Sequence, residues 1–245
     1  MKRNVLAVVL PALIVGLGSL PAQATFYTNY PTGDSRMYFS NTNWSEGASG
    51  YLSVYDDGAG NSQRTVVQFD LSGLPGGLSV ASATLTLYPR WAGTSQTGNP
   101  VEVYRVTSSW TEGGGPPDYT LTGVNWAYRD AGTSNPWTTP GVDNAGTTGL
   151  PLASPYASDS TFPGYDVPQN FDVTLLAQQW YGGTYPDYGF MLRPNGTSGL
   201  HWYSREEGGT SLGPKLVIEL IPEPASFGLL ALAAFGARFW LRRKS

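Results

Sequence analysis

Short segments with alternating apolar and polar residues run through the middle of the chain. In one of them, Val67, Phe69 and Leu71 share one face of a strand, while Gln68 and Asp70 point to the other face. The same period of two recurs at residues 83–88, 190–192, 200–202 and 215–220. Such alternation is typical of strands that are buried on one face only. We expect the last three segments to form consecutive antiparallel strands.

One stretch departs from this period and has helical spacing instead. Its larger side chains recur three to four residues apart: Leu175, Leu176, Gln179 and Trp180. Thr174 stands where an N-cap is expected, and Gly182 and Gly183 follow the last periodic residue. The pattern predicts one short helix.

Turn-forming residues separate the predicted strands. They occur at residues 74–77, 93–100, 193–196 and 207–209. The chain has 31 glycines and 19 prolines but also 13% aromatic residues, which favours turn-rich β-structure over disorder. We therefore predict an all-β fold, a single jelly-roll-like antiparallel β-sandwich with one short helix. Residues 132–168 lack periodicity and read as a long surface loop.

The N-terminus has the pattern of a cleavable export signal. Lys2 and Arg3 precede an apolar stretch, and the small residues Ala22 and Ala24 occupy the positions that a signal peptidase reads. We expect a signal peptide over residues 1–24 and a mature chain that starts at Thr25. An uncleaved membrane anchor is the alternative.

The C-terminus combines three features in order. Pro222, Glu223 and Pro224 are followed by an uncharged apolar run over residues 225–237, and basic residues end the chain. This arrangement resembles the PEP-CTERM sorting signal, here over residues 222–245. The resemblance implies transient anchoring in the inner membrane by a transmembrane helix, processing by an exosortase-type protease, and delivery to the surface or matrix of exopolysaccharide-producing bacteria. An ordinary tail anchor that is never cleaved is the alternative.

Removal of both end segments leaves one domain, residues 25–221, which is long enough for a sandwich with a sizeable core. The whole chain carries a formal net charge of −4. The basic residues of the two ends contribute to this figure, so the domain without its ends is more acidic. An acidic surface repels nucleic acid, so we expect no nucleic-acid partner. Cysteine is absent, which excludes disulfides and thiolate metal sites.

A second resemblance covers residues 34–220. It is carried in order by residues 64–74, 80–88, 101–112, 124–126, 171–174, 189–193, 203–206 and 214–216, and includes the runs Ser108-Ser109-Trp110-Thr111-Glu112 and Tyr203-Ser204-Arg205-Glu206. These segments resemble the DNRLRE domain family. The resemblance implies a jelly-roll sandwich similar to carbohydrate-binding modules. The 132–168 stretch is an insertion relative to that family.

Catalytic residues are hard to find in this sequence. His201 is the one histidine, and no cysteine or second histidine accompanies it to build a metal site or a nucleophile relay. Glu112 and Glu206 could form the carboxylate pair of a glycosidase, but they also suit charge pairing at strand ends. We expect no catalytic residue and no enzyme.

Sugar binding needs an aromatic platform for the C–H face of the ring and polar groups for the hydroxyls. Aromatic and arginine side chains in or beside the predicted loops are candidates: Trp91, Trp137, Tyr128, Tyr156, Tyr165, Arg90 and Arg129. Either arginine could fork to a sugar carboxylate. Three other tryptophans, Trp110, Trp126 and Trp180, occupy positions that suit core packing instead.

One glycine-rich loop offers oxygen ligands of the kind that calcium prefers. Asp56, Asp57 and Asn61 lie in this loop and are the candidate metal ligands. A plain solvated turn is the alternative. Calcium is therefore the one cofactor that the sequence suggests.

Three hypotheses fit the sequence. The leading one is a non-catalytic exported surface protein that binds exopolysaccharide or biofilm matrix through its sandwich. The second is a structural matrix or adhesion protein without glycan binding. The third is a polysaccharide lyase or hydrolase, which requires Glu112 and Glu206 to face one cleft.

Overall fold

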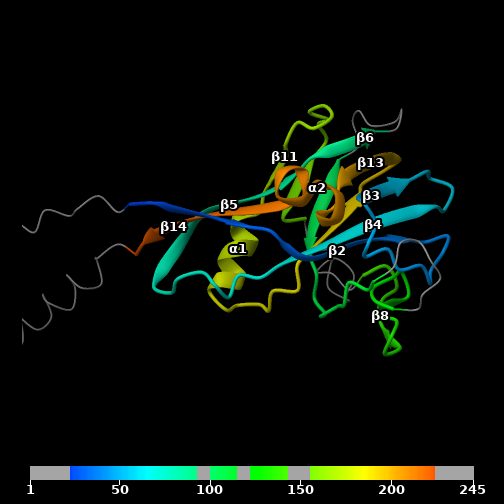
Figure 1. Ribbon diagram of the computed structural model, residues 1–245, viewed down its shortest axis with the longest axis horizontal. Coiled ribbons are helices and arrows are strands. Elements are labelled where there is room, and N and C mark those ends of the chain that lie inside the picture. The colour runs from blue at the N-terminus through cyan, green and yellow to red at the C-terminus, as the bar shows by residue number, and fades with distance from the viewer. Residues whose placement is uncertain (1–22, 93–99, 115–121, 143–154, 224–245) are drawn as a thin grey trace, which may run out of the picture. The chain divides into compact units, whose positions relative to one another are not determined.

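The computed structural model describes residues 23–92, 100–114, 122–142 and 155–223. Two antiparallel sheets and two short helices make up this part of the chain, with a separate small hairpin (Figure 1). The all-β sandwich that the alternation predicted is confirmed.

The smaller sheet has four strands in the order β1-β14-β5-β11. Their bounds are β1 (Thr25–Asn29), β5 (Leu78–Leu87), β11 (Gln169–Asp172) and β14 (Lys215–Pro222). The larger sheet has the order β10-β7-β12-β4-β3-β13-β6, and β2 also pairs with β4. Its strands are β2 (Pro31–Tyr38), β3 (Tyr51–Asp56), β4 (Ser62–Phe69), β6 (Pro89–Ala92), β7 (Val101–Arg105), β10 (Ala157–Asp159), β12 (Phe190–Pro194) and β13 (Ser198–Tyr203).

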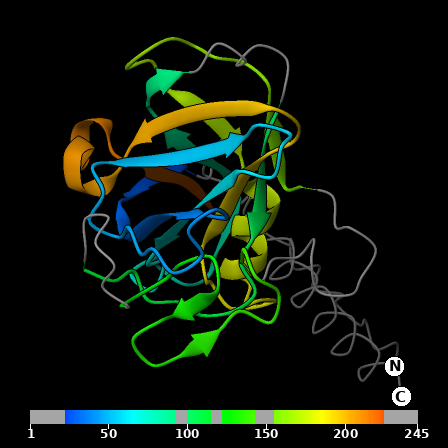
Figure 2. The same ribbon diagram turned by 90° about the vertical axis from the view of Figure 1, so that its right-hand side faces the viewer.

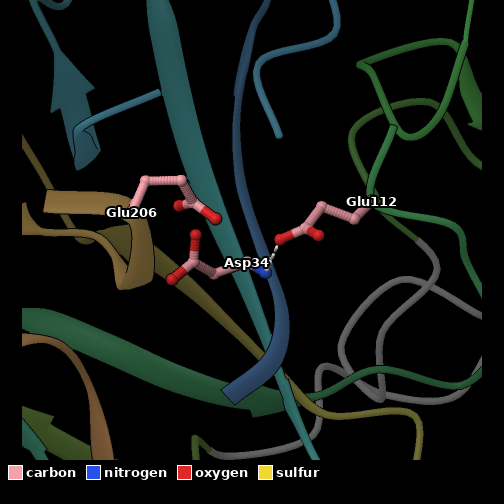
Figure 3. Close-up of side chains that lie close together, drawn as sticks. All are labelled: Asp34, Glu112 and Glu206. Atoms are coloured by element: carbon pink, nitrogen blue, oxygen red, sulfur yellow. Dashed lines mark hydrogen bonds between the residues drawn. The ribbon is translucent and has the colours of Figure 1, made fainter. Parts of the chain in front are cut away.

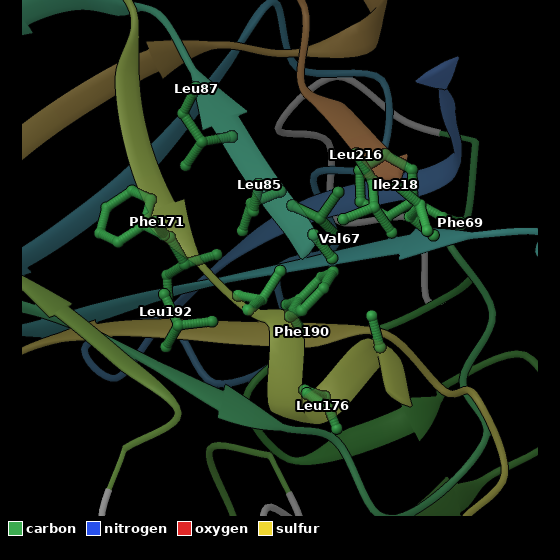
Figure 4. Close-up of a cluster of buried hydrophobic side chains, with 14 of the residues drawn as sticks. Val67, Phe69, Leu85, Leu87, Phe171, Leu176, Phe190, Leu192, Leu216 and Ile218 are labelled. Atoms are coloured by element: carbon green, nitrogen blue, oxygen red, sulfur yellow. The ribbon is translucent and has the colours of Figure 1, made fainter. Parts of the chain in front are cut away.

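The main core lies where these sheets face each other (Figure 4). Leu85 and Leu87 of β5 and Leu216 and Ile218 of β14 supply the small sheet's side, and all four are fully buried. The larger sheet adds further buried side chains: Leu52, Val54, Val67, Phe69, Val101, Val103, Phe190, Leu192, Leu200 and Trp202. Because these positions alternate along their strands, one face of each strand is apolar, as the sequence pattern predicts.

A second, smaller core covers part of the opposite face of the large sheet. Met191 of β12, Val66 of β4 and Tyr104 of β7 point into it, whereas their chain neighbours point into the main core. The remaining members include four residues from 106–126 together with Met37, Trp137 and Val142. The described residues 106–114 and 122–142 therefore fold back over this half of the sheet. Residues 122–142 contain the hairpin β8 (Tyr128–Asp130) and β9 (Asn135–Pro136).

The expectation that the last three apolar segments pair consecutively is wrong. β12 pairs with β4 and β7, β13 with β3 and β6, and β14 with β1 and β5. Each segment has the predicted strand character. Alternation reports which face is buried but carries no information on which distant strand becomes the neighbour.

The predicted helix is α1 (Thr174–Tyr181), with Gly182 at its end. It buries Leu176, Ala177 and Trp180 in the main core, while Leu175 is 59% exposed. Thr174 is inside the helix and does not cap it, because its hydroxyl donates to Asp172 and accepts the backbone N–H of Ala83.

A second helix, α2 (Arg205–Leu212), was not predicted, because its Glu207-Gly208-Gly209 run reads as a turn. Gly209 has a φ of +52°, so the segment is two short turns joined by a kink.

Neither helix in the described part of the chain combines the length and apolar character required to cross a membrane. The predicted signal peptide and the predicted C-terminal transmembrane helix fall on residues 1–22 and 224–245, outside the described residues. Ala24 and Thr25 lie at the start of the described chain, and Pro222 ends β14 opposite Leu78.

Candidate functional site

A row of stacked rings crosses the part of the large sheet that the second core leaves uncovered. The Trp91 ring of β6 contacts the His201 ring of β13 at an interplanar angle of 40°, with centroids 4.6 Å apart, and His201 stacks on Tyr51 of β3 at 4.7 Å. The Arg36 guanidinium lies 3.5 Å from the centroid of the Tyr51 ring. Leu200 and Trp202, the neighbours of His201, point into the main core, so His201 faces away from it.

The row has a buried end and an open end. Arg36 is 5% exposed and pairs with the buried Glu46. Trp91, at the other end, is 47% exposed. One face of its indole is held by His201, which leaves an oriented aromatic surface for a ligand.

A β-bulge adds a cation to this surface. Pairing between β13 and β6 runs from His201 opposite Trp91 directly to Trp202 opposite Pro89, so Arg90 is the unpaired residue. Its guanidinium lies 5.6 Å from the Tyr51 ring and 5.7 Å from the Tyr203 ring. Arg90 is exposed and pairs with Glu207 of α2. The bulge therefore puts Arg90 and Trp91, which are adjacent in sequence, over the same row of rings.

A third candidate, Tyr165, lies on a segment whose backbone is hydrogen-bonded to the edge strand β6. The N–H of Asp166 donates to the carbonyl of Pro89, at 2.9 Å, which ties the 162–166 segment to the start of β6. Tyr165 is 55% exposed and has an edge contact with Phe162. Two of the predicted binding residues, Arg90 and Trp91, thus come together, and the backbone of the segment that carries Tyr165 is bonded to the same strand. We call Arg90 and Trp91, with the rings beneath them, the Trp91 face.

Burial and, to a smaller extent, the positive charges of Arg36 and Arg90 together lower the pKa of His201 to about 4. His201 is therefore neutral near pH 7. It acts in this row as a flat ring that spaces Trp91 from Tyr51.

Three other candidates lie in and beside the β8–β9 hairpin and do not join the Trp91 face. β6 and β8 lie at opposite ends of the view in Figure 1 and remain so after the rotation to Figure 2. Trp137 is only 3% exposed, and its Nε1 donates to the carbonyl of Asn125 at 2.9 Å. It presents no open ring face, which corrects the expectation that it is a binding platform. Tyr128 is half-buried, and Arg129 donates to the Ser109 carbonyl and hydroxyl.

Tyr156 also has a structural position. It packs on the main core, and its hydroxyl donates to Gln179 of α1 at 2.8 Å. The tryptophans assigned to packing are confirmed in that role, since Trp110, Trp126 and Trp180 are each at most 9% exposed.

Glu112 and Glu206 do meet in space, together with Asp34 of β2 (Figure 3). One carboxylate oxygen of each residue lies within 4.8 Å of the other two. Arg205 binds two of the three, with its Nη2 at 2.7 Å from Glu112 and at 3.0 Å from Glu206. Its backbone N–H donates to Asp34, whose own N–H donates to Glu112.

Burial raises the pKa of Asp34 well above its ordinary value, and the nearby charge of Glu206 raises it further. Burial also raises the pKa of Glu112. Because the guanidinium of Arg205 already neutralises part of this charge, a divalent cation would have to compete with it. The contacts match the charge-pairing interpretation of Glu112 and Glu206.

The candidate calcium loop is closed on itself. Asp57 accepts the backbone N–H groups of Ala59 and Asn61 and the Asn61 amide, and Asp56 accepts the N–H of Gly58. These bonds lower the pKa of Asp57, with the Asn61 amide as the largest cause. They engage both oxygens of Asp57 and one oxygen of Asp56 within the loop itself, which favours the plain turn.

Two members of the stacked row were missed in the sequence, Tyr51 and Arg36. Each lies in a strand with nothing local to mark it, and Arg36 belongs to the mostly polar β2.

Comparison with protein families gives two matches. The PEP-CTERM protein-sorting motif matches residues 220–244, which confirms the resemblance of the C-terminus and marks the protein as exported and sorted by an exosortase. A search of the curated proteins finds no match. Over the sandwich, the matching family is not the DNRLRE domain expected from the sequence. The model for the disaggregatase related repeat domain matches residues 34–218, three quarters of the chain, and the protein therefore belongs to that family.

Proposed function

We propose that this exported protein is a non-catalytic component of the bacterial surface that binds exopolysaccharide through the Trp91 face. The proposal rests on the exposure and the orientation of the Trp91 ring. Its indole is 47% exposed, yet it is oriented by the His201 ring beneath it. An aromatic surface that is open and already ordered binds the C–H face of a sugar ring at little entropic cost.

The polar groups around Trp91 suit a hydroxyl-rich ligand. Arg90 lies on the same surface, and Tyr203 is half-buried beside Arg90. Tyr165 is exposed on the segment whose backbone is bonded to the start of β6. Several such groups around one platform can bind sugar hydroxyls while the ring stacks. β6 is also the edge strand of its sheet, so a long polymer could lie along it without meeting another strand.

Binding of the purified full-length chain to an array of polysaccharides tests the proposal. The array includes the exopolysaccharide of the producing bacterium, and each measurement is made with calcium and with a chelator. We expect saturable binding that Trp91→Ala reduces by ~10-fold or more, the equivalent of a lost stacking contact of about 1.4 kcal/mol. Phe26→Ala is the matched control, because Phe26 is 65% exposed on β1 of the other sheet.

The outcomes separate the hypotheses. Saturable binding that depends on Trp91 and not on Phe26 supports a glycan-binding face. Absence of binding under both conditions supports a structural matrix or adhesion protein. Release of soluble sugar, abolished by Glu112→Gln, would instead indicate a hydrolase or lyase.

A further inference from the structure

A cavity of about 740 Å³ lies between the end of β4, the turn after it and the end of α1. Its wall includes Gln68, Asp70, Trp180, Tyr181 and Asp187. None of the lining residues belongs to the Trp91 face. The cavity is therefore a separate place on the molecule.

Trp180 differs from other buried tryptophans of this fold. The Nε1 atoms of Trp110, Trp137 and Trp202 donate to oxygen acceptors at 2.8, 2.9 and 2.9 Å. Trp180 is 7% exposed, and its buried Nε1 has no hydrogen-bond partner among the described residues. A buried donor without an acceptor costs free energy, so its retention here calls for a reason.

Asp187 presents an unpaired acceptor at the same cavity. Its Oδ1 accepts the backbone N–H of Gly189 at 3.0 Å, whereas its Oδ2 is buried without a partner. Gly189 has a φ of +86°, and a Cβ there would lie 2.3 Å from the Val67 carbonyl, so this turn is tightly held. Burial and, to a smaller extent, the negative charge of Asp70 together raise the pKa of Asp187 to about 7.

The charge of the cavity wall limits the class of ligand that the cavity can bind. Among the lining residues, the charged ones are Asp70 and Asp187, and none is basic. An anion would therefore be repelled. Near neutral pH, Asp187 is partly protonated, so it can both donate and accept, and Thr32, Gln68 and Ser72 add neutral polar groups. Trp180, Tyr181 and Phe69 supply apolar surface.

We propose that this cavity binds a single neutral sugar unit, whose hydroxyls pair with the Trp180 Nε1–H and the Asp187 Oδ2. This site goes beyond the Trp91 face and does not depend on it. Both atoms are shielded from bulk solvent, so a side chain of the wall moves when the ligand enters. Gln68 can move at the loss of one long hydrogen bond, since its Nε2 lies 3.4 Å from the Asp187 carbonyl.

Titration of the full-length chain with methyl glycosides of glucose, galactose and mannose tests the site, followed by the indole N–H resonances in NMR. We expect the Trp180 resonance, assigned from Trp180→Phe, to shift saturably while the Trp202 resonance stays in place. Trp180→Phe removes the N–H donor together with the five-membered ring of the indole, and binding by this variant is followed through the backbone N–H resonances. It should weaken binding by ~10-fold or more, the equivalent of at least one lost hydrogen bond to a hydroxyl. Asp187→Asn should weaken binding more above pH 7, where the wild-type carboxylate is ionised and is the stronger acceptor, than below it.

Matched controls keep the outcome clear. Asp70→Asn changes an exposed residue of the cavity wall and should weaken binding without affecting folding. Asp57→Asn changes a partly exposed turn carboxylate elsewhere and should have no effect. Trp91→Ala should leave the Trp180 shift unchanged, so failure of the Trp91 proposal and failure of this one are distinguishable. No shift with any glycoside, or a shift with glucosamine or tetramethylammonium alone, would overturn the proposal.

Discussion

The Trp91 face and the β8–β9 hairpin are built from the same residue types, and they use them in opposite ways. Each combines a tryptophan, an arginine and a tyrosine in turn-rich sequence. Trp91 is 47% exposed and Trp137 is 3% exposed. Arg90 stands over two tyrosine rings, whereas Arg129 is bound to the backbone and hydroxyl of Ser109.

The difference arises from what covers each ring. The segment after β7 folds back and encloses Trp137 in the second core, and the backbone carbonyl of Asn125 takes its N–H. Trp91 stays half-exposed, with His201 against one side of its ring. An aromatic residue in a loop thus becomes a packing residue when a segment far away in the sequence covers it, and a binding platform when its ring stays open. Four predictions test this contrast.

The largest effect should follow Trp137→Ala. Truncation of a buried tryptophan leaves a cavity and removes its hydrogen bond, so we expect a loss of ~3–5 kcal/mol in the free energy of unfolding. Trp91→Ala should cost less than about 1 kcal/mol, since half of its surface is already exposed. Urea denaturation of both variants measures the contrast. Equal losses would mean that Trp91 is a core residue and not a platform.

The buried end of the stacked row should be nearly as sensitive. Arg36→Met removes the cation between Tyr51 and Glu46 and leaves the buried Glu46 carboxylate without its partner. We expect a loss of ~3 kcal/mol in unfolding free energy at pH 7. Part of this loss should be recovered at pH 4, where Glu46, whose pKa is raised by burial, becomes protonated. The double variant Arg36→Met with Glu46→Gln is the control, and it should be more stable than Arg36→Met alone.

The middle of the row should respond to pH. The pKa of His201 falls from 6.5 to about 4 on folding, so between these values the unfolded chain binds the proton and the folded chain does not. The stability due to this residue is fully present above about pH 6.5 and is lost as the pH falls toward 4. We expect wild type to lose ~2 kcal/mol more than His201→Phe between pH 7 and pH 4. Carboxylates titrate in both proteins and cancel, so identical pH profiles would contradict the assigned burial of His201.

The smallest effects should come from the two arginines. Arg90→Ala and Arg129→Ala each remove partly exposed contacts, and each should cost less than about 1 kcal/mol in stability. Only Arg90→Ala should weaken polysaccharide binding, because Arg129 lies with the hairpin. Binding isotherms for the pair, measured on the same glycan, separate their roles. Loss of binding in Arg129→Ala alone would move the proposed site to the hairpin.

Local features of the sequence determined several properties of this protein. Alternation at residues 67–71 and 83–88 identified strands. Side chains two positions apart on a strand share a face, so a half-buried strand shows its pattern within its own few residues. The spacing of Leu176 and Trp180 identified α1 for the same reason. The order of Pro222, Glu223, Pro224, apolar run and basic end identified the sorting motif.

Only the tertiary structure decided what these elements do together. The partners of β12, β13 and β14, the bulge at Arg90 and the burial of Trp137 all depend on contacts between residues far apart in the chain. The same holds for Glu112 and Glu206, which meet around Arg205, and for the unpaired Trp180 and Asp187 at one cavity. A sequence pattern records which side of a strand is apolar. Which distant segment covers that strand, and which ring stays open, follows from long-range packing that no local pattern contains.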